Sequence, residues 1–151
     1  MTSLRPARDD DWPAILRVAK EALPNAPDGN IGWLEARRRF DGLRRHYVAE
    51  EATRIVAYGG IEASGEGRWR LFIVMDAMRL ASLGVSLLHQ LMNNVRDLEG
   101  HIMWMREQAD DAALLSFARE HGFHEKNRFV VQDGSAYDGV EVVELEQVAD
   151  D

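Results

Sequence analysis

Hydrophobic residues recur along this chain with two different periods, and the change of period predicts where helices and strands lie. Spacings of three and four residues predict helices over residues 12–23, 31–43, 83–100 and 111–122. Shorter apolar runs predict strands over residues 3–7, 46–50, 54–63, 69–75, 101–106, 128–133 and 140–145. Strands and helices therefore alternate in an order that predicts a mixed α/β sheet flanked by helices.

Residues that favour turns separate these segments. The acidic run Asp9–Asp11 supplies capping candidates for the first helix, and the breaker-rich residues 24–30 predict a loop. Residues 64–67 predict a tight turn between two strands, and a glycine ends each of the last two helices. No repeat or linker interrupts the 151 residues, so we expect one domain over residues 1–151.

Composition narrows the classes of partner and cofactor. The chain has no cysteine, which excludes disulfides, thiolate metal ligands and a cysteine nucleophile. A net charge of −8 argues against nucleic acid as a partner. No run approaches the ~20 apolar residues of a membrane span, and the polar start is unlike a secretory signal. We therefore expect a cytoplasmic protein without a membrane or nucleic-acid partner, and no histidine spacing predicts a metal site.

Residues 74–98 carry the most informative motif. A strand end is followed by Arg79 and a turn of small residues, and then by a long amphipathic helix. A tight turn that opens a helix presents free backbone N–H groups at the positive end of the helix dipole. Such a terminus binds phosphate or pyrophosphate, so the motif predicts an anionic ligand there.

In several places the chain resembles the GCN5-related N-acetyltransferase (GNAT) superfamily, and the resemblance covers nearly all of its length. One segment is similar to the family's first strand and helix start, a second to its loop for the pyrophosphate of acyl-CoA, and a third to its penultimate helix. The matching residues are 4–12, Val74 with Arg79 and Gly84, Leu87 with Leu88, and 111–123.

The resemblance implies a fold, a reaction and a set of ligand contacts. The implied fold is a mostly antiparallel sheet of about seven strands with four helices, splayed between the fourth and fifth strands. The implied reaction transfers an acetyl group from acetyl-CoA directly to a primary amine of a small molecule, or less readily of a protein. Amides of residues 80–85 would hold the pyrophosphate, and an N–H near Ile73 or Val74 would polarise the thioester carbonyl. The predicted contacts are Ile73, Val74, Met75, Arg79, Leu80, Ala81, Ser82, Leu83, Gly84, Val85, Asp111 and Phe117.

Five positions depart from the family's pattern. Ser82 replaces a loop glycine, Arg68 a glutamate base, Ala118 a tyrosine acid, Asp111 an asparagine and Asp76 a proline. A positioned acid or base typically contributes about 10²–10⁴-fold, so its loss slows a reaction without abolishing it. The same departures support an alternative: a catalytically inactive GNAT-fold domain that binds acyl-CoA or another ligand for a regulatory or structural role.

Several polar residues are candidates to replace the missing acid and base. We take Glu62, Tyr58 and Ser116 as the catalytic candidates, with Glu107 and His121 as further ones. Each also has a structural explanation, because strand and helix ends carry exposed charges and a lone tyrosine commonly packs in a core. The sequence decides neither the acceptor amine nor the homodimer that the resemblance allows.

Overall fold

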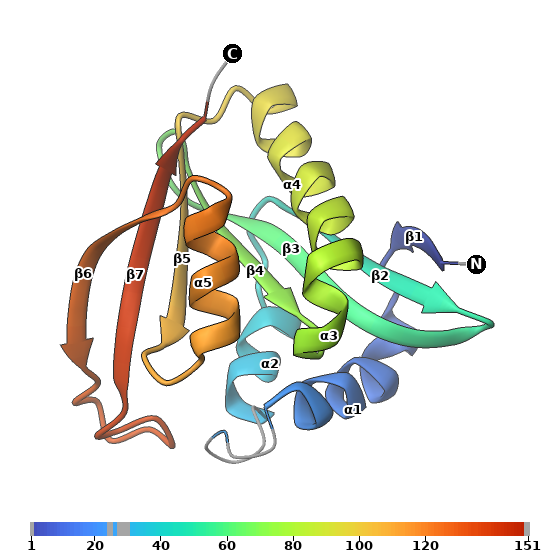
Figure 1. The fold of residues 1–151 in the computed structure, drawn as a ribbon, viewed down its shortest axis with the longest axis horizontal. Coiled ribbons are helices and arrows are strands. Elements are labelled where there is room, and N and C mark those ends of the chain that lie inside the picture. The colour runs from blue at the N-terminus through green and yellow to red at the C-terminus, as the bar shows by residue number, and fades with distance from the viewer. Residues whose placement is uncertain (1, 24–25, 27–30, 150–151) are drawn as a thin grey trace.

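The computed structural model describes residues 2–23, 26 and 31–149, which form a seven-stranded sheet with helices on both faces (Figure 1). The strands are β1 (Thr2–Pro6), β2 (Arg44–Glu51), β3 (Arg54–Gly65), β4 (Arg68–Val74), β5 (Ile102–Gln108), β6 (His124–Val130) and β7 (Glu141–Val148). The helices are α1 (Trp12–Ala22), α2 (Ile31–Arg38), α3 (Ala77–Arg79), α4 (Val85–Asp97) and α5 (Ala112–Glu120). Apart from Ala26, the predicted loop over residues 24–30 lies outside the described residues.

The strand order across the sheet is β1-β2-β3-β4-β5-β7-β6. Neighbouring strands are antiparallel except for β4 and β5, which are parallel. A parallel pair needs a crossover connection, and α3 and α4 supply it between β4 and β5. The predicted mixed, mostly antiparallel sheet is confirmed.

Alternation of side chains along the strands builds a separate core on each face of the sheet. On β4, Leu71 and Ile73 pack with residues of α4 and α5, whereas Phe72 between them packs with residues of α1 and α2. Successive side chains of a strand point to opposite faces, so one apolar strand serves both cores. This arrangement places β4 in the interior, where its end is covered from both sides.

Helix α4 packs closely against β3 because Gly59 has no side chain. A Cβ at this position would lie 2.7 Å from Cδ2 of Leu87 and 2.9 Å from the carbonyl oxygen of Phe72. Both distances are shorter than ordinary contacts, so the helix can approach the sheet this closely only over glycine.

The start of α1 is tied to β1 through the buried carboxylate of Asp11. Two guanidinium nitrogens of Arg5 each donate to it at 2.8 Å, and the backbone N–H of Arg8 donates at 2.7 Å. The acidic run therefore does not act as a simple helix cap. It forms a 3-10 turn (Asp9–Asp11) whose last carboxylate connects strand and helix.

Most predicted bounds differ from those observed by a few residues, and α2 and β6 show the largest differences. Helix α2 ends at Arg38 rather than at residue 43, and the chain then turns through residues 39–43 into β2. Strand β6 begins at His124 rather than at residue 128. It is the edge strand and six of its seven side chains are exposed, so no hydrophobic pattern marks its first half.

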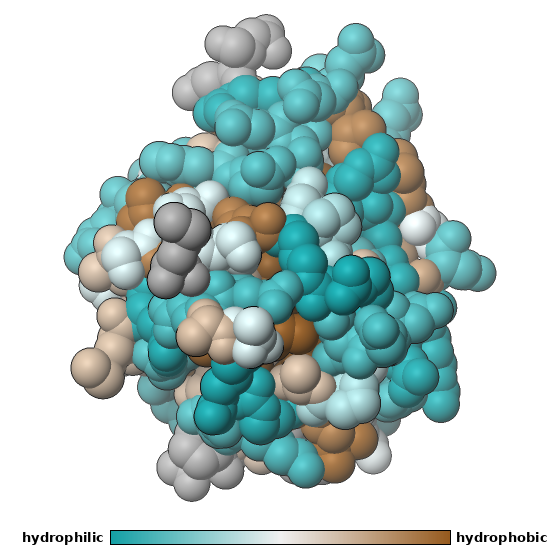
Figure 2. All heavy atoms as spheres, turned by 90° about the vertical axis from the view of Figure 1, so that its right-hand side faces the viewer, coloured by the Kyte–Doolittle hydropathy of each residue, from teal (hydrophilic) through white to brown (hydrophobic). Residues whose placement is uncertain are grey.

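The molecular face beside β1 is mainly hydrophilic, with apolar side chains scattered over it rather than gathered in one area (Figure 2). None of the described helices has the length and apolar character that crossing a membrane requires. Among the described residues, no group of three or more histidine and acidic side chains is placed to hold a metal ion.

Candidate active site

Strands β4 and β5 run side by side only at their beginnings. The parallel register pairs Arg68 with Ile102, Trp69 with Met103 and Arg70 with Trp104, and among the described residues no later pair forms. Beyond Arg70, β4 remains paired with β3, while β5 remains paired with β7 along its whole length. The sheet therefore opens between β4 and β5, as predicted. The edge of β4 over residues 71–74 is left without a strand neighbour on that side.

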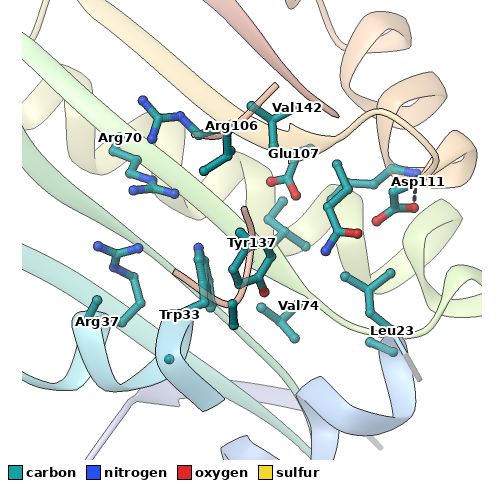
Figure 3. A pocket seen from close by; sticks show the side chains of 18 of the residues that line it. Leu23, Trp33, Arg37, Arg70, Val74, Arg106, Glu107, Asp111, Tyr137 and Val142 are labelled. Atoms are coloured by element: carbon teal, nitrogen blue, oxygen red, sulfur yellow. Dashed lines mark hydrogen bonds between the residues drawn. The ribbon is translucent and has the colours of Figure 1, made fainter. Parts of the chain in front are cut away.

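A cavity of about 440 Å³ occupies this opening (Figure 3). Ile73, Val74 and Met75 line it at the end of β4, and Glu107 and Gln108 line it at the end of β5. Residues of α1, α2 and α5 and of the chain between β6 and β7 complete the wall. A largely apolar cavity with a few convergent polar groups is the usual form of a small-molecule site.

Two carboxyl groups lie on the β5 side of the cavity. Burial, together with the neighbouring charge of Asp111, raises the pKa of Glu107 to about 8 against the opposing charge of Arg70. Asp111 accepts the backbone N–H of Leu114 at 3.3 Å, so it caps α5. Burial raises the pKa of Asp111 as well. A carboxyl group with a pKa near neutrality can exchange a proton with a ligand at physiological pH.

Three guanidinium groups gather toward the opposite end of the cavity, and one of them, Arg106, also belongs to β5. Figure 3 shows Arg37, Arg70 and Arg106 on one side of Tyr137, with Glu107 and Asp111 toward the other. Arg37 pairs with Glu62 and Arg106 pairs with Glu144, so two of the three charges are balanced. The cavity thus has a cationic end and an end with titratable carboxyl groups.

The predicted catalytic residues lie outside this cavity lining. Glu62 is buried and paired with Arg37, which lines the cavity. Tyr58 is fully buried between aromatic rings, and burial raises the pKa of its phenol. Ser116 is exposed on α5, where its hydroxyl lies 3.5 Å from a carboxylate oxygen of Glu120.

The predicted phosphate turn is helical in the structure. Asp76 begins the helix, because its carboxylate accepts the backbone N–H of Arg79, and α3 then continues through a π-helical turn (η3, Leu80–Gly84) into α4. The N–H of Leu80 donates to the carbonyl of Ala77, and that of Val85 to Ser82. Part of the predicted row of amides is therefore already engaged within the helix.

Arg79 is held by two carboxylates. Its guanidinium pairs with Asp76 on one side and with Glu51 at the end of β2 on the other, the latter at 2.8 Å. These contacts raise the pKa of Arg79 above its usual value. Arg79 lines a second cavity of about 250 Å³, together with Arg17 and Arg54 and with three acidic residues. The positive charge of Arg79, which was predicted to bind a phosphate, is thus neutralised by two carboxylates of the protein itself.

The other predicted ligand contacts fall into three environments. Leu80 lines the main cavity, as do the three residues at the end of β4 and Asp111. Leu83, Gly84 and Phe117 are buried in the core below α4 and α5. Ala81 and Ser82 are exposed on the helix surface, and Val85 is half-buried.

Sequence reasoning missed Trp33, Arg70, Arg106 and Tyr137 as cavity residues. Arg70 carried a usable signal, because it is a charged residue inside an otherwise apolar strand. The others come from α2, β5 and the chain between β6 and β7, which meet only in the folded protein. Arg37 belongs to the arginine-rich run Arg37, Arg38, Arg39, Arg44 and Arg45, which predicts mainly solvated side chains. The alternative for this run was that one or two of its arginines line the edge of an anionic ligand site, and Arg37 does line the cavity.

Comparisons with known proteins identify the fold. No protein-family model and no curated protein matches the sequence. Solved structures do match. The ribosomal-protein-alanine N-acetyltransferase from Escherichia coli superposes with a TM-score of 0.78 at 15% identity, over 100% of this chain and 96% of that one. An N-acetyltransferase from Staphylococcus aureus gives 0.76 at 17% identity, over 99% of each chain.

A spermidine N-acetyltransferase chimera that includes the Vibrio cholerae enzyme gives a TM-score of 0.71 at 15% identity, over 98% of this chain and 95% of that one. These structural neighbours are N-acetyltransferases. A structure from Desulfovibrio desulfuricans that is described as of the GNAT family superposes with a TM-score of 0.78 at 16% identity, over 99% of this chain and 100% of that one. The opening between β4 and β5 is the feature that the resemblance predicted. The chain therefore has the GNAT fold.

Proposed function

We propose that the protein is an N-acyltransferase that moves an acetyl group from acetyl-CoA to a primary amine of a small molecule. The observation that carries the proposal is the cavity between the separated ends of β4 and β5, with a free strand edge on one wall and Glu107 on the other. The shared fold with N-acetyltransferases supports the same reaction class.

The acyl-bearing arm of acetyl-CoA suits the residues present. Residues 71–74 offer backbone groups without a strand partner on one side, and amide groups of an extended ligand can pair with such an edge. Apolar side chains of Ile73, Leu80 and Leu114 line the same cavity. The pyrophosphate of acetyl-CoA fits the residues around Arg79 less well. Arg79 would have to exchange Glu51 and Asp76 for phosphate oxygens.

The chain's own groups can carry out the transfer. Acetyl-CoA supplies an activated thioester carbonyl, and a backbone N–H at Ile73 or Val74 can donate to its oxygen. Glu107, with a pKa of about 8, can take the proton that the amine nitrogen loses as it attacks the carbonyl carbon. The C–N bond forms and the C–S bond breaks. The thiolate leaves and takes up the proton that the nitrogen gave to Glu107.

A second candidate function is a GNAT-fold domain that binds a ligand without transferring an acyl group. The ion pairs of Arg79 favour it, because they neutralise the charge that a pyrophosphate needs. Ala118 also lacks the acidic hydroxyl expected at its position. The two candidates agree on the cavity and differ in whether it supports turnover.

Calorimetric titration with acetyl-CoA and with free CoA tests the proposal first. We expect micromolar binding, weakened in the Arg79→Ala variant and retained in Arg8→Ala, which removes an exposed arginine far from the cavity lining. Thiol release in the presence of primary amines then separates the candidates. Binding without thiol release for any amine supports the binding domain, and no binding to either compound overturns both CoA-based functions.

A further inference from the structure

Arg70 brings to the cavity a positive charge that is not paired with any described residue. Within residues 2–23, 26 and 31–149 its guanidinium makes no hydrogen bond and no ion pair, and its Nε is buried without a partner. A buried donor left unsatisfied costs free energy, and more so when it belongs to a charged group. The arginine therefore lacks an acceptor that a ligand can supply.

The surroundings hold Arg70 in place and increase the need for an anion. Its guanidinium lies 5.3 Å from the ring centre of Trp104, and Arg106 lies 5.6 Å from the same ring. Burial and the like charges of Arg37 and Arg106 lower the pKa of Arg70 to about 10, so it stays positive at neutral pH. Glu107 attracts it but forms no ion pair with it.

The charge balance indicates the kind of anion. Arg37 and Arg106 have their own carboxylate partners, Glu62 and Glu144, which leaves the single charge of Arg70 to be matched. A carboxylate carries one negative charge, and its two oxygens fit the planar guanidinium. A phosphate would bring a second negative charge toward Glu107 and Asp111.

We infer that the acceptor is a primary amine that also bears a carboxylate, as an amino acid does, and that Arg70 binds the carboxylate while the amine faces Glu107. The inference rests on the proposed function for the transfer step, but the carboxylate site itself does not need it. The aromatic rings of Trp33 and Tyr137 line the cavity beside these groups and suit an apolar side chain on the acceptor (Figure 3).

Matched pairs of acceptors test the inference. Each pair is an amino acid and the amine that lacks its carboxylate: phenylalanine with phenethylamine, tryptophan with tryptamine, and leucine with isoamylamine. For at least one pair, we expect the kcat/KM of acetyl transfer to be about 10- to 100-fold higher with the amino acid than with its amine, because the carboxylate lowers KM. The Arg70→Met variant should lose most of that preference, and Arg70→Lys should keep part of it, because lysine retains the charge without the fork.

Arg68→Met is the matched control. Arg68 lies two residues away on β4, pairs with Glu146, and does not line the cavity, so this variant should keep the preference. If Arg70→Met does not fold, the test uses Arg70→Lys and the same ratio, that of kcat/KM for the amino acid to kcat/KM for its amine. Equal kcat/KM within every pair overturns the inference while leaving the proposed function intact. A preference that is undiminished in Arg70→Met, or in Arg70→Lys if Arg70→Met does not fold, does the same.

Calorimetric titration with the same compounds, without acetyl-CoA, distinguishes failure of the carboxylate inference from failure of the proposed transferase function. Arg70-dependent binding of an amino acid without any thiol release supports the carboxylate site and contradicts the transferase function. No binding and no turnover of any member of the panel overturns the inference. Acetyl-CoA binding in the same preparation then shows whether the CoA site fails as well.

Discussion

The Nε of Arg37 donates to Oε2 of Glu62 at 2.7 Å, in an ion pair that leaves only 8% of Arg37 and 3% of Glu62 exposed. Burial raises the pKa of Glu62, and the charge of Arg37 opposes that shift. The pair connects α2 to β3 and fixes one wall of the cavity. Glu62 therefore has a structural role that its sequence position did not reveal.

Glu62→Gln should destabilise the protein by about 3 kcal/mol, because removing one partner leaves the other charge buried and uncompensated. Urea denaturation measures this difference. Replacing both residues by leucine should recover most of the loss. Glu35→Gln is the control, since Glu35 makes only exposed pairs with Arg38 and Arg39. Full stability of Glu62→Gln together with lost acetyl transfer would instead identify Glu62 as the base.

Glu107 should give acetyl transfer a rising pH dependence. The base must be ionised to accept a proton, so kcat/KM should rise through pH 8 and level off above it. An aryl amine is the suitable acceptor, because its own ionisation lies far below this range. Glu107→Gln should lower kcat/KM about 10²–10⁴-fold and remove the rise.

Asp111→Asn gives a sharper form of the same test. Asparagine can still cap α5, but it removes the negative charge that raises the pKa of Glu107. The rise in kcat/KM should therefore move to lower pH. Glu120→Gln on the exposed face of α5 is the control and should leave the profile in place. An unmoved profile in Asp111→Asn means that another group titrates.

Glu51 should compete with the pyrophosphate of CoA for Arg79. Glu51→Gln removes one of the two carboxylates that hold this arginine, so it should strengthen CoA binding about two- to fivefold. Pantetheine lacks the pyrophosphate, and its affinity should not change. Glu66→Gln in the exposed turn between β3 and β4 is the control. Unchanged CoA affinity in Glu51→Gln would show that Arg79 does not contact the pyrophosphate.

Local periods and the order of elements were sufficient to predict a mixed sheet flanked by helices, and the apolar run of β4 is one clear example. The opening between β4 and β5 was predicted only by the resemblance to the GNAT superfamily. The helical start at Asp76 was not predicted. A carboxylate three residues before Arg79 can cap a helix and also neutralise that arginine, and the sequence alone does not show that it does both.

The cavity residues were predicted least well because their roles depend on distant partners. Glu62 and Glu107 are both glutamates near strand ends, and nothing local distinguishes them. The structure does: Arg37 neutralises Glu62, whereas Asp111 adds a second negative charge beside Glu107. Such differences come from packing between elements far apart in the chain, which periodicity does not encode.

His46 provides a pH-sensitive contribution to stability outside the cavity. His46 lies on β2, and its Nδ1 is 3.1 Å from the hydroxyl oxygen of Tyr58. In a neutral imidazole with its proton on Nε2, Nδ1 can accept a hydrogen bond from that hydroxyl. Burial, together with the charge of Arg44, lowers the pKa of His46 from 6.5 to about 4 against the opposing charges of Asp9 and Asp11. Folding therefore favours the neutral ring.

The unfolded chain binds a proton at His46 between pH 6.5 and about 4 and the folded protein does not, so stability should fall as pH is lowered through this window. Each pKa unit corresponds to about 1.4 kcal/mol, so the shift of the His46 pKa from 6.5 to about 4 sets an upper limit of about 3.5 kcal/mol on this contribution. His46→Phe should be less stable at pH 8 but lose less stability between pH 6.5 and 4, as measured by urea denaturation. His124→Gln, at an exposed position on β6, should keep the wild-type slope. An equal slope in His46→Phe would assign the loss of stability to the carboxylates alone.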